Sequence, residues 1–289
     1  MVAELVLIRV LGPVDLLTTE GVVAVGGPLE RKLLAALAVS ANHLVTTDQM
    51  SQILWPGKAP RTAAATLQTH LSRLRRRLGG GRITGEDHGY RLDITRAELD
   101  ALVFEDLVSR ATGSRQAEES LSLCAAALGL WRGVPFGDFA DEEPFRLEAI
   151  RLDELRLLVM EVRLRAEIAL GWHEIIVGEL EALAEEYPYR ESFWYLLITA
   201  LSMAGRRVEA LRAYDRLRRI LADVGLEPTE DLRRLEDRIL LEDPAVRPRL
   251  DLPLGAAGPD SRNYPTAVPA RTIGAITHAC RLSLVGRVP

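Results

Sequence analysis

The chain has 289 residues, of which 48% are hydrophobic and 27% are charged, and its formal net charge is −5 at pH 7. This composition indicates a soluble globular protein with room for two domains. No stretch approaches the roughly 18 continuous apolar residues that cross a bilayer, and the apolar start ELVLIRVL lacks the features of a signal peptide, so we expect a cytoplasmic protein without a membrane partner.

The charge is unevenly distributed along the chain. Residues 1–95 carry eleven basic and eight acidic side chains, which leaves −8 for residues 96–289. Between Asp48 and Glu86 there are seven basic residues and no acidic one. In a protein that is acidic overall, a basic window of this length indicates a surface for a polyanion.

The first 25 residues predict a small antiparallel sheet. Three short segments rich in Val, Leu and Ile are separated by Gly12-Pro13 and Glu20-Gly21, and they lie at 4–11, 14–18 and 22–25. Helical periodicity follows at 28–40 and at 46–55, where a Thr/Asp cap begins the second helix and Pro56-Gly57 ends it.

A third helix and a hairpin complete the N-terminal part. The helix is expected to begin near Arg61-Thr62, after Pro60, and to end at Leu78 before three glycines. The segment GRITGEDHGYRLDI then predicts a two-stranded hairpin. The order of sheet, three helices and hairpin is that of a winged helix-turn-helix with an added N-terminal sheet.

The rest of the chain to residue 242 is predicted to be helical, near 99–111, 116–131, 143–170, 174–187, 190–204, 207–223 and 228–241. Gly171 and Gly205 lie 34 residues apart, each between two amphipathic helices, and a tetratricopeptide-like spacing is followed by Trp194, Leu197, Ala210 and Tyr214. Such helix pairs expose a concave surface for a partner. The expected fold class is mainly α with a small β component, a winged helix followed by an all-α helical repeat.

The third helix has two different faces. At about 100° per residue, one stripe that should face the core contains Leu67, Leu71, Leu74, Leu78 and Ala64. The opposite side has no acid, and its candidate DNA contacts are Thr62, Thr66, Thr69, Arg73, Arg76 and Arg77. We therefore expect these arginines to have no acidic partner and the helix to enter a major groove, although an ordinary solvated face is the alternative.

The hairpin adds further candidate DNA contacts, namely Arg82, His88 and Arg91, which could flank a minor groove or the phosphate backbone. The alternative for each is a turn or strand-surface residue. Arg75 lies toward the edge of the core, where a structural salt bridge to the first helix or the sheet is expected.

Sequence motifs give no support for an enzyme. The five histidines form no HExxH motif or i,i+4 metal pair, and Cys124 and Cys280 have no metal-ligand spacing. Gly57-Lys58 is no phosphate loop, because Gln52 stands where the first glycine is needed. We therefore expect no catalytic residue, no metal and no cofactor.

Two sets of segments resemble one bacterial family. VLGPVDL, GPLERKLLAALAVSANHLVTTDQMSQILWPGKAPRTAAATLQTHLSRLRRRLG and HGYRLDI are similar to the OmpR-type winged helix, a two-component-type output domain, of the Streptomyces antibiotic regulatory protein (SARP) family. LWRGVPFGDFADEEPF, EYPYRESFWYLLITAL and GRRVEALRAYDRLRRILADVGLEP resemble the bacterial transcriptional activator domain that follows it in that family.

The resemblance implies an actinobacterial transcriptional activator that binds direct repeats in double-stranded promoter DNA, often of secondary-metabolite genes, and assists RNA polymerase. It implies a recognition helix at Ala63–Leu78, a wing at 82–94, a second protomer on DNA, and a polymerase contact through Trp55 and Lys58 of the loop Trp55–Pro60.

The predicted domains are a winged helix at 1–96, an activator domain at 97–242 and a linker or tail at 243–289. The motor domain of the larger family members is not found, and SLVGRVP at 283–289 is either a natural end or the edge of a further domain. The alternative function is a helical-repeat scaffold for protein partners whose winged helix does not bind DNA.

Overall fold

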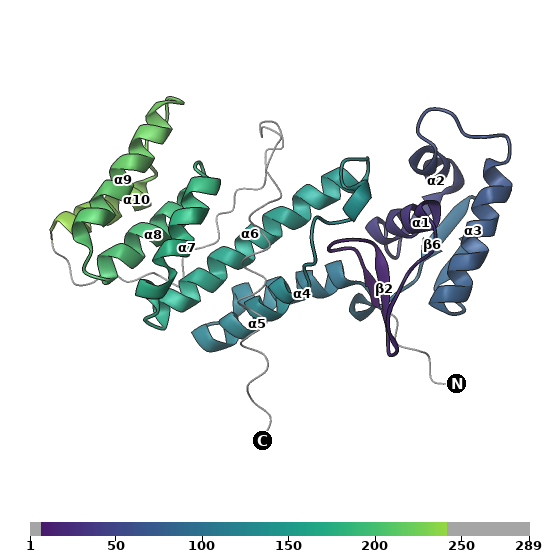
Figure 1. The fold of residues 1–289 in the computed structure, drawn as a ribbon, viewed down its shortest axis with the longest axis horizontal. Helices are drawn as coiled ribbons and strands as arrows, with labels where there is room; N and C mark the ends of the chain where they lie inside the picture. Colours follow the sequence, from purple (N-terminus) through teal and green to yellow (C-terminus); the bar gives the residue numbers. More distant parts are fainter. Residues whose placement is uncertain (1–6, 242–289) are drawn as a thin grey trace, which may run out of the picture. The chain divides into compact units, whose positions relative to one another are not determined.

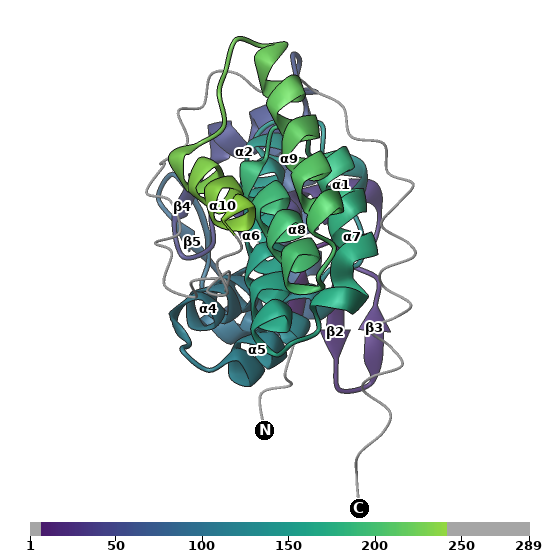
Figure 2. The same ribbon diagram turned by 90° about the vertical axis from the view of Figure 1, so that its left-hand side faces the viewer.

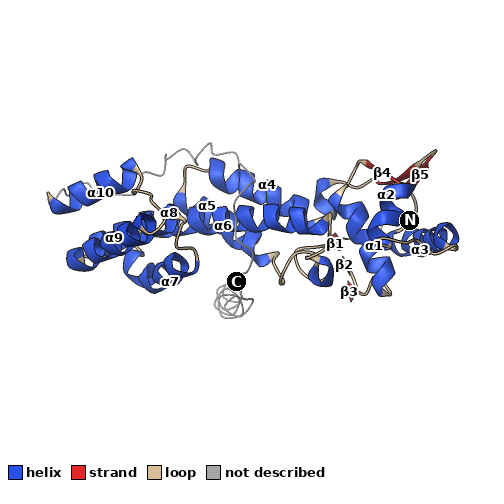
Figure 3. Ribbon diagram, turned by 90° about the horizontal axis from the view of Figure 1, so that it is seen from above, coloured by secondary structure: helices blue, strands red, loops and turns tan. Residues whose placement is uncertain are grey.

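The computed structural model describes residues 7–241, which fall into two compact units (Figure 1). Unit 1 contains residues 7–109 and 126–157, and unit 2 contains residues 110–125 and 158–241. Helices dominate both units, and all strands of the described chain belong to unit 1 (Figure 3). The predicted tail at 243–289 lies outside the described residues.

Unit 1 opens with the predicted antiparallel sheet, formed by β1 (Leu7–Arg9), β2 (Asp15–Thr18) and β3 (Gly21–Val23). Successive side chains of a strand point to opposite faces of the sheet. Ile8 and Leu16 pair across β1 and β2 and are both buried, so they mark the covered face. The expected sheet is confirmed.

Three helices follow in the predicted order, α1 (Pro28–Val39), α2 (Thr47–Leu54) and α3 (Ala63–Leu78). A capping box begins α2, in which Thr46 accepts from the Gln49 amide and Gln49 accepts from the Thr46 amide. The leucines of α3 are buried as predicted, but Ala64 is exposed, so its assignment to the core was wrong. The helical angle places Ala64 on the same side of α3 as the leucines. It does not show whether another helix covers that side at the N-terminal end of α3, where Ala64 lies.

A second sheet supports the wing, with the strand order β4 (Leu44–Thr46), β6 (Gly89–Leu92) and β5 (Ile83–Glu86). The hairpin was predicted, whereas β4 was not, because three residues are too few to show an alternating pattern. The strands β4 and β6 approach closely at Gly89, where an added Cβ would lie 2.2 Å from the Val45 carbonyl oxygen. Glycine at this position therefore permits the pairing.

Asp100, the first residue of α4 (Asp100–Gly113), fastens that helix to the N-terminal sheet. Its buried carboxylate accepts the Val10 amide at 2.8 Å and the Leu11 amide at 3.1 Å, and Arg132 lies 3.5 Å away. Burial raises the pKa of Asp100 to about 6, although these hydrogen bonds and the Arg132 charge oppose the rise.

The segment around Phe136 also belongs to unit 1. The Phe136 amide donates to the Val10 carbonyl at 2.7 Å, and the Arg132 amide donates to the Leu11 carbonyl at 2.8 Å. Phe136 is buried and its ring lies 5.5 Å from that of Phe145. Unit 1 therefore extends past the domain boundary predicted at residue 96, and that boundary stays a prediction.

Unit 2 is helical throughout its described residues. Helices α5 (Ala117–Gly129) and α6 (Phe145–Ala169) contribute residues to both units, and unit 2 continues with α7 (His173–Glu186), α8 (Glu191–Met203), α9 (Arg207–Ala222) and α10 (Glu230–Leu240). Figure 2 shows α7, α8 and α9 side by side, and neighbouring helices of this series pack on one another.

The repeat positions of unit 2 lie where the sequence placed them. Trp194, Leu197, Ala210 and Tyr214 are buried between the helices, and the Trp194 indole donates to the Pro188 carbonyl at 3.0 Å. The turn glycines adopt left-handed conformations, with φ of +86° at Gly171 and +73° at Gly205. The predicted fold class, a winged helix followed by a helical domain, is confirmed.

We predict that Asp100→Ala lowers the free energy of unfolding by about 3–5 kcal/mol, because the two buried amides lose their acceptor, while Arg132 keeps its ion pair with Asp15. Urea unfolding monitored by circular dichroism measures the change. Asp106→Ala is the matched control on the same helix, since Asp106 is 51% exposed and pairs with Arg96; it should change stability by less than about 1 kcal/mol. Equal losses in the two variants would contradict the anchoring role of Asp100.

Candidate nucleic-acid interface

The structure puts most of the predicted DNA contacts of α3 on one exposed side of that helix. Thr66 is half-buried, and the exposed members of the set are Thr62, Thr69, Arg73, Arg76 and Arg77. The Thr69 hydroxyl donates to the Ala65 carbonyl at 2.9 Å, so its methyl group and oxygen lone pairs stay available to a ligand. Small side chains thus occupy the N-terminal half of this side and arginines the C-terminal half.

A buried carboxylate from α1 holds two of these arginines. Glu30 is 4% exposed, and its Oε1 lies 3.0 Å from Arg73 Nη1 and 3.1 Å from His70 Nδ1. Its Oε2 lies 3.9 Å from Arg77 Nε, and Arg77 also donates to the Ala24 carbonyl at 3.2 Å. The expectation that the arginines of α3 have no acidic partner is wrong for Arg73 and Arg77.

The electrostatics of Glu30 favour its charged form. Burial raises the pKa of Glu30, but hydrogen bonds from Arg73 and His70 and the charge of Arg77 outweigh it, and the pKa lies below its ordinary value. The carboxylate fits because residue 26 is a glycine with φ +125°, where an added Cβ would lie 1.9 Å from Glu30 Oε2. Sequence inspection missed this pairing, since no local spacing relates Glu30 to Arg73.

The same helix α1 contacts the segment at 131–145. Lys32 is 8% exposed, and its Nζ lies 2.5 Å from Glu142 Oε2. Arg31 lies 3.8 Å from Asp138. Three consecutive charged residues of α1 therefore contact α3 on one side and the 131–145 segment on the other.

Three basic side chains of the acid-free window have no ion pair or side-chain hydrogen bond within residues 7–241, namely Lys58, Arg61 and Arg76. Lys58 and Arg61 are exposed in the loop that joins α2 to α3, which Figure 1 shows beside the N-terminal end of α3. Trp55, the other predicted polymerase contact, is the half-buried C-cap residue of α2. The exposed positive charge is therefore concentrated on this loop and at Arg76.

Arg75 has the structural role predicted for it, although its partner is not an acid. Its Nε donates to the Ile83 carbonyl of β5 at 2.9 Å, and its guanidinium lies 5.6 Å from the centre of the Tyr90 ring. The Tyr90 hydroxyl accepts from Gln68 of α3 at 2.5 Å. Gln68 and Tyr90, which sequence inspection passed over, join the exposed side of α3 to the wing.

The basic residues predicted on the wing are largely occupied. Arg82 is 17% exposed, donates to the Leu78 carbonyl and lies 2.7 Å from Glu98. Arg91 pairs with Glu86 at 2.9 Å and with Asp93 at 2.6 Å. His88 is exposed at the turn, and its carbonyl accepts the Thr47 amide at 3.0 Å. The structure therefore brings α3 and the α2–α3 loop together as a positive surface, while the wing at 82–94 has two arginines against three acids.

The arginines and threonines on the exposed side of α3 are of the residue types that form hydrogen bonds to phosphates and base edges. Arginine offers a planar fork of donors for phosphate or guanine, and threonine offers a hydroxyl and a methyl group.

Within residues 7–241 there is no helix with the length and apolar character that crossing a membrane requires.

Two family profiles cover most of the described chain. Residues 24–92 match "Transcriptional regulatory protein, C terminal", and residues 99–240 match "Bacterial transcriptional activator domain". The first match contains α1, α2, α3 and the wing, and the second begins one residue before α4 and ends with α10.

Curated relatives agree with both profiles. The regulatory protein AfsR of Streptomyces griseus is 35% identical over 87% of this chain and 26% of its own length. The regulatory protein DnrI of Streptomyces peucetius is 33% identical over 75% of this chain and 85% of its own length. The chain thus spans about a quarter of AfsR and most of DnrI.

One solved structure has the same fold over most of the chain. EmbR of Mycobacterium tuberculosis, in complex with a low affinity phosphopeptide, superposes with a TM-score of 0.76 at 34% identity, over 83% of this chain and 66% of the EmbR chain. Both profiles, the relatives and this structure agree on a transcription regulator. The chain belongs to the SARP family of transcriptional activators, with an OmpR-type winged helix followed by a bacterial transcriptional activator domain.

Proposed function

We propose that this chain is a sequence-specific DNA-binding transcriptional activator whose recognition helix is α3. The observation that carries the proposal is the exposed side of α3 with the adjoining loop, where Lys58, Arg61 and Arg76 have no partner within the described residues. A solvated helix surface of an acidic protein would ordinarily pair its cations with nearby acids. An unpaired cationic surface next to small hydroxyl side chains suits a phosphate backbone and a major groove.

The proposal gives the two halves of α3 different roles. Thr62, Thr66 and Thr69 lie in the N-terminal half, where short side chains allow the helix to approach base edges closely. Arg73, Arg76 and Arg77 contact phosphates or guanines from the C-terminal half. Arg82 is left out of the proposed contacts because Glu98 and the Leu78 carbonyl hold it inside unit 1.

The proposed partners are promoter DNA, a second protomer on DNA, and RNA polymerase. The loop Trp55–Pro60 is the proposed polymerase contact, because Lys58 is exposed there and Trp55 offers a large half-buried ring beside it. Genes of secondary metabolism are the proposed targets, by similarity to AfsR and DnrI of Streptomyces. The competing function is a helical-repeat scaffold that binds protein and leaves DNA alone.

The dependence of affinity on salt separates these two functions. We predict that log affinity for promoter DNA falls against log salt with a slope of about −2.7 to −4.5 per protomer, because three unpaired cations, and up to two more that share Glu30, would each neutralise one phosphate. Lys58, Arg61, Arg73, Arg76 and Arg77 are the five. Fluorescence anisotropy over a series of salt concentrations measures the slope. A flat response, or absence of binding to fragments from the genome, would favour the scaffold.

Arg76 and Arg73 should respond differently to substitution by alanine. Arg76→Ala is expected to weaken DNA binding by about 1–3 kcal/mol without changing stability, since Arg76 has no partner within the described chain. Arg73→Ala should weaken binding and also lower stability by about 1–3 kcal/mol, because Glu30 loses a charged donor. Electrophoretic shift and urea unfolding measure the two effects.

A matched control for both variants is Arg218→Ala, an exposed arginine of unit 2 whose partner Asp215 is also exposed. Its DNA affinity should equal that of the wild type. Wild-type affinity in Arg76→Ala and Arg73→Ala, with correct folding, would remove α3 from the interface.

Two protomers are predicted to bind direct repeats head to tail. Repeats on one face of the duplex need a centre-to-centre spacing of roughly 10–10.5 base pairs, and a head-to-tail contact joins different surfaces of the two protomers. Adding about five base pairs should therefore abolish cooperative binding, whereas adding one full turn should weaken it less. Footprinting on promoters with altered spacers tests this, and protection of an inverted repeat would contradict the head-to-tail arrangement only.

A further inference from the structure

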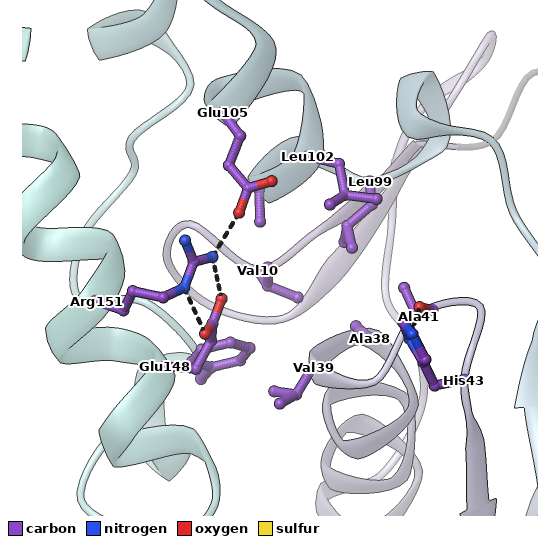
Figure 4. Close-up of a pocket in the computed structure, with 12 residues that line it drawn as sticks. Val10, Ala38, Val39, Ala41, His43, Leu99, Leu102, Glu105, Glu148 and Arg151 are labelled. Carbon is purple, nitrogen blue, oxygen red and sulfur yellow. Dashed lines mark hydrogen bonds and ion pairs between the residues drawn. The ribbon is translucent and has the colours of Figure 1, made fainter. Parts of the chain in front are cut away.

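A hollow of about 220 Å³ in unit 1 contains charged groups that already balance one another (Figure 4). Arg151 donates to Glu148 at 2.6 and 2.9 Å and to Glu105 at 2.5 Å. Glu105 also pairs with Arg96 at 3.0 Å. Each of these acids therefore has a basic partner, and the hollow does not select a ligand by its charge.

A polar group on α3 differs from these, because it keeps one donor and one acceptor unused. Gln68 is exposed, and its Nε2 donates one hydrogen to the Tyr90 hydroxyl of β6 at 2.5 Å. An amide nitrogen has two hydrogens, and an amide oxygen has two lone pairs. Within residues 7–241 the second hydrogen of Nε2 and the oxygen Oε1 have no partner. Gln68 therefore presents one donor beside one acceptor to solvent.

The strands of the wing hold Tyr90 in place. Tyr90 lies on β6, the central strand, where it pairs with Val45 of β4 and Gly85 of β5. An added Cβ at Gly85 would lie 3.6 Å from Cε1 of the Tyr90 ring, so the ring lies over that glycine. The Arg75 guanidinium lies 5.6 Å from the ring centre, and Arg75 is itself held by the Ile83 carbonyl. The hydroxyl that orients Gln68 thus has a fixed position on the wing.

Gln68 belongs to the side of α3 that is proposed to face DNA. Gln68, Ser72 and Arg76 follow one another at intervals of four residues, so they form one row along the helix. All three are exposed, and Arg76 is the arginine of α3 without a partner in the described chain. Ala65, three residues before Gln68, is also exposed, and its small side chain leaves room for a base edge.

The four bases differ in what they offer to a fixed donor and acceptor. In the major groove adenine presents the N7 acceptor beside the N6 amino donor, which an amide matches with two hydrogen bonds. Guanine presents two acceptors, N7 and O6, and would set O6 against the amide oxygen. A free glutamine can turn and donate both hydrogens to guanine, but the Tyr90 hydroxyl already takes one of them. Held in this way, the amide matches adenine alone among the purines.

We propose that Gln68 is a specificity-determining residue that reads one adenine in each repeat, and that Tyr90 is its positioning residue. Oε1 accepts from the N6 amino group and the free hydrogen of Nε2 donates to N7, while the other hydrogen stays on the Tyr90 hydroxyl. This inference rests on the proposed DNA-binding function of α3 and assigns a base to it. A purely structural bond between α3 and the wing would leave base preference unchanged when either side chain is altered.

The test measures base preference with the full chain. A binding sequence is selected from a randomised duplex library, and each base pair of that sequence is then replaced in turn. At one position of each repeat, the wild type should prefer adenine to guanine by about tenfold or more. Replacement of that adenine by 7-deazaadenine, which lacks the N7 acceptor, should also weaken binding.

Two variants identify the residues responsible. Gln68→Ala should abolish both the adenine preference and the effect of 7-deazaadenine, at that position only. Tyr90→Phe keeps the ring and removes the hydroxyl, so the freed amide should accept guanine to within about threefold of adenine. Matched controls come from unit 2, where Gln116→Ala and Tyr189→Phe alter exposed side chains of the same types and should keep the wild-type preference.

Unchanged base preference in Gln68→Ala, or a preference for guanine at the position that Gln68 controls, would overturn the inference. Wild-type discrimination in Tyr90→Phe would overturn the positioning role of that hydroxyl. If Arg76→Ala weakens binding in the same assay while Gln68→Ala changes no preference, the DNA-binding function stands and the adenine assignment fails. If neither variant changes binding or preference, the proposed function of α3 fails with it.

Discussion

Burial of the Glu30 carboxylate constrains helix α3, because a buried charge without partners would cost several kcal/mol. Its partners His70, Arg73 and Arg77 lie on α3 at i, i+3 and i+7, which is one side of that helix. A rotation of α3 by one residue, about 100°, would remove these contacts and expose the leucine stripe. One interaction thus fixes both the rotation of α3 and the identity of the arginine, Arg76, that points elsewhere.

The constraint continues through α1 into the segment that resembles the activator domain. Lys32 is buried and pairs with Glu142, just as the buried Glu30 pairs with Arg73 of α3. Both charged residues of α1 therefore have partners that are distant in the sequence. Asp100 likewise joins α4 to the segment after β1, because its carboxylate accepts the amides of Val10 and Leu11. The motif LWRGVPFGDFADEEPF is therefore part of the support of the winged helix, which gives a physical reason for its position within unit 1.

The sequence was sufficient for the long helices and for their buried stripes. Periodicity over ten or more residues placed helices α1 and α4 to α10 within a few residues of their observed limits, and glycines marked the turns at 171 and 205. β4 and the 3-10 helix at Gly137–Phe139 were missed, because elements of three residues have no measurable period. The closure of unit 1 by Asp100 was also out of reach, since its acceptors pair with amides about 90 residues away.

The sequence could predict where the basic side chains of the candidate interface lie, but not which of them are paired with acids. Within the acid-free window the partners of Arg73, Arg77 and Arg82 come from Glu30 and Glu98, which lie outside it. Pairing removes net charge but leaves donors, because a guanidinium has five N–H groups and Glu30 takes only part of the fork. In the proposed complex Arg73 and Arg77 would therefore donate oriented hydrogen bonds to a phosphate, while the long-range attraction to DNA would come mainly from Lys58, Arg61 and Arg76.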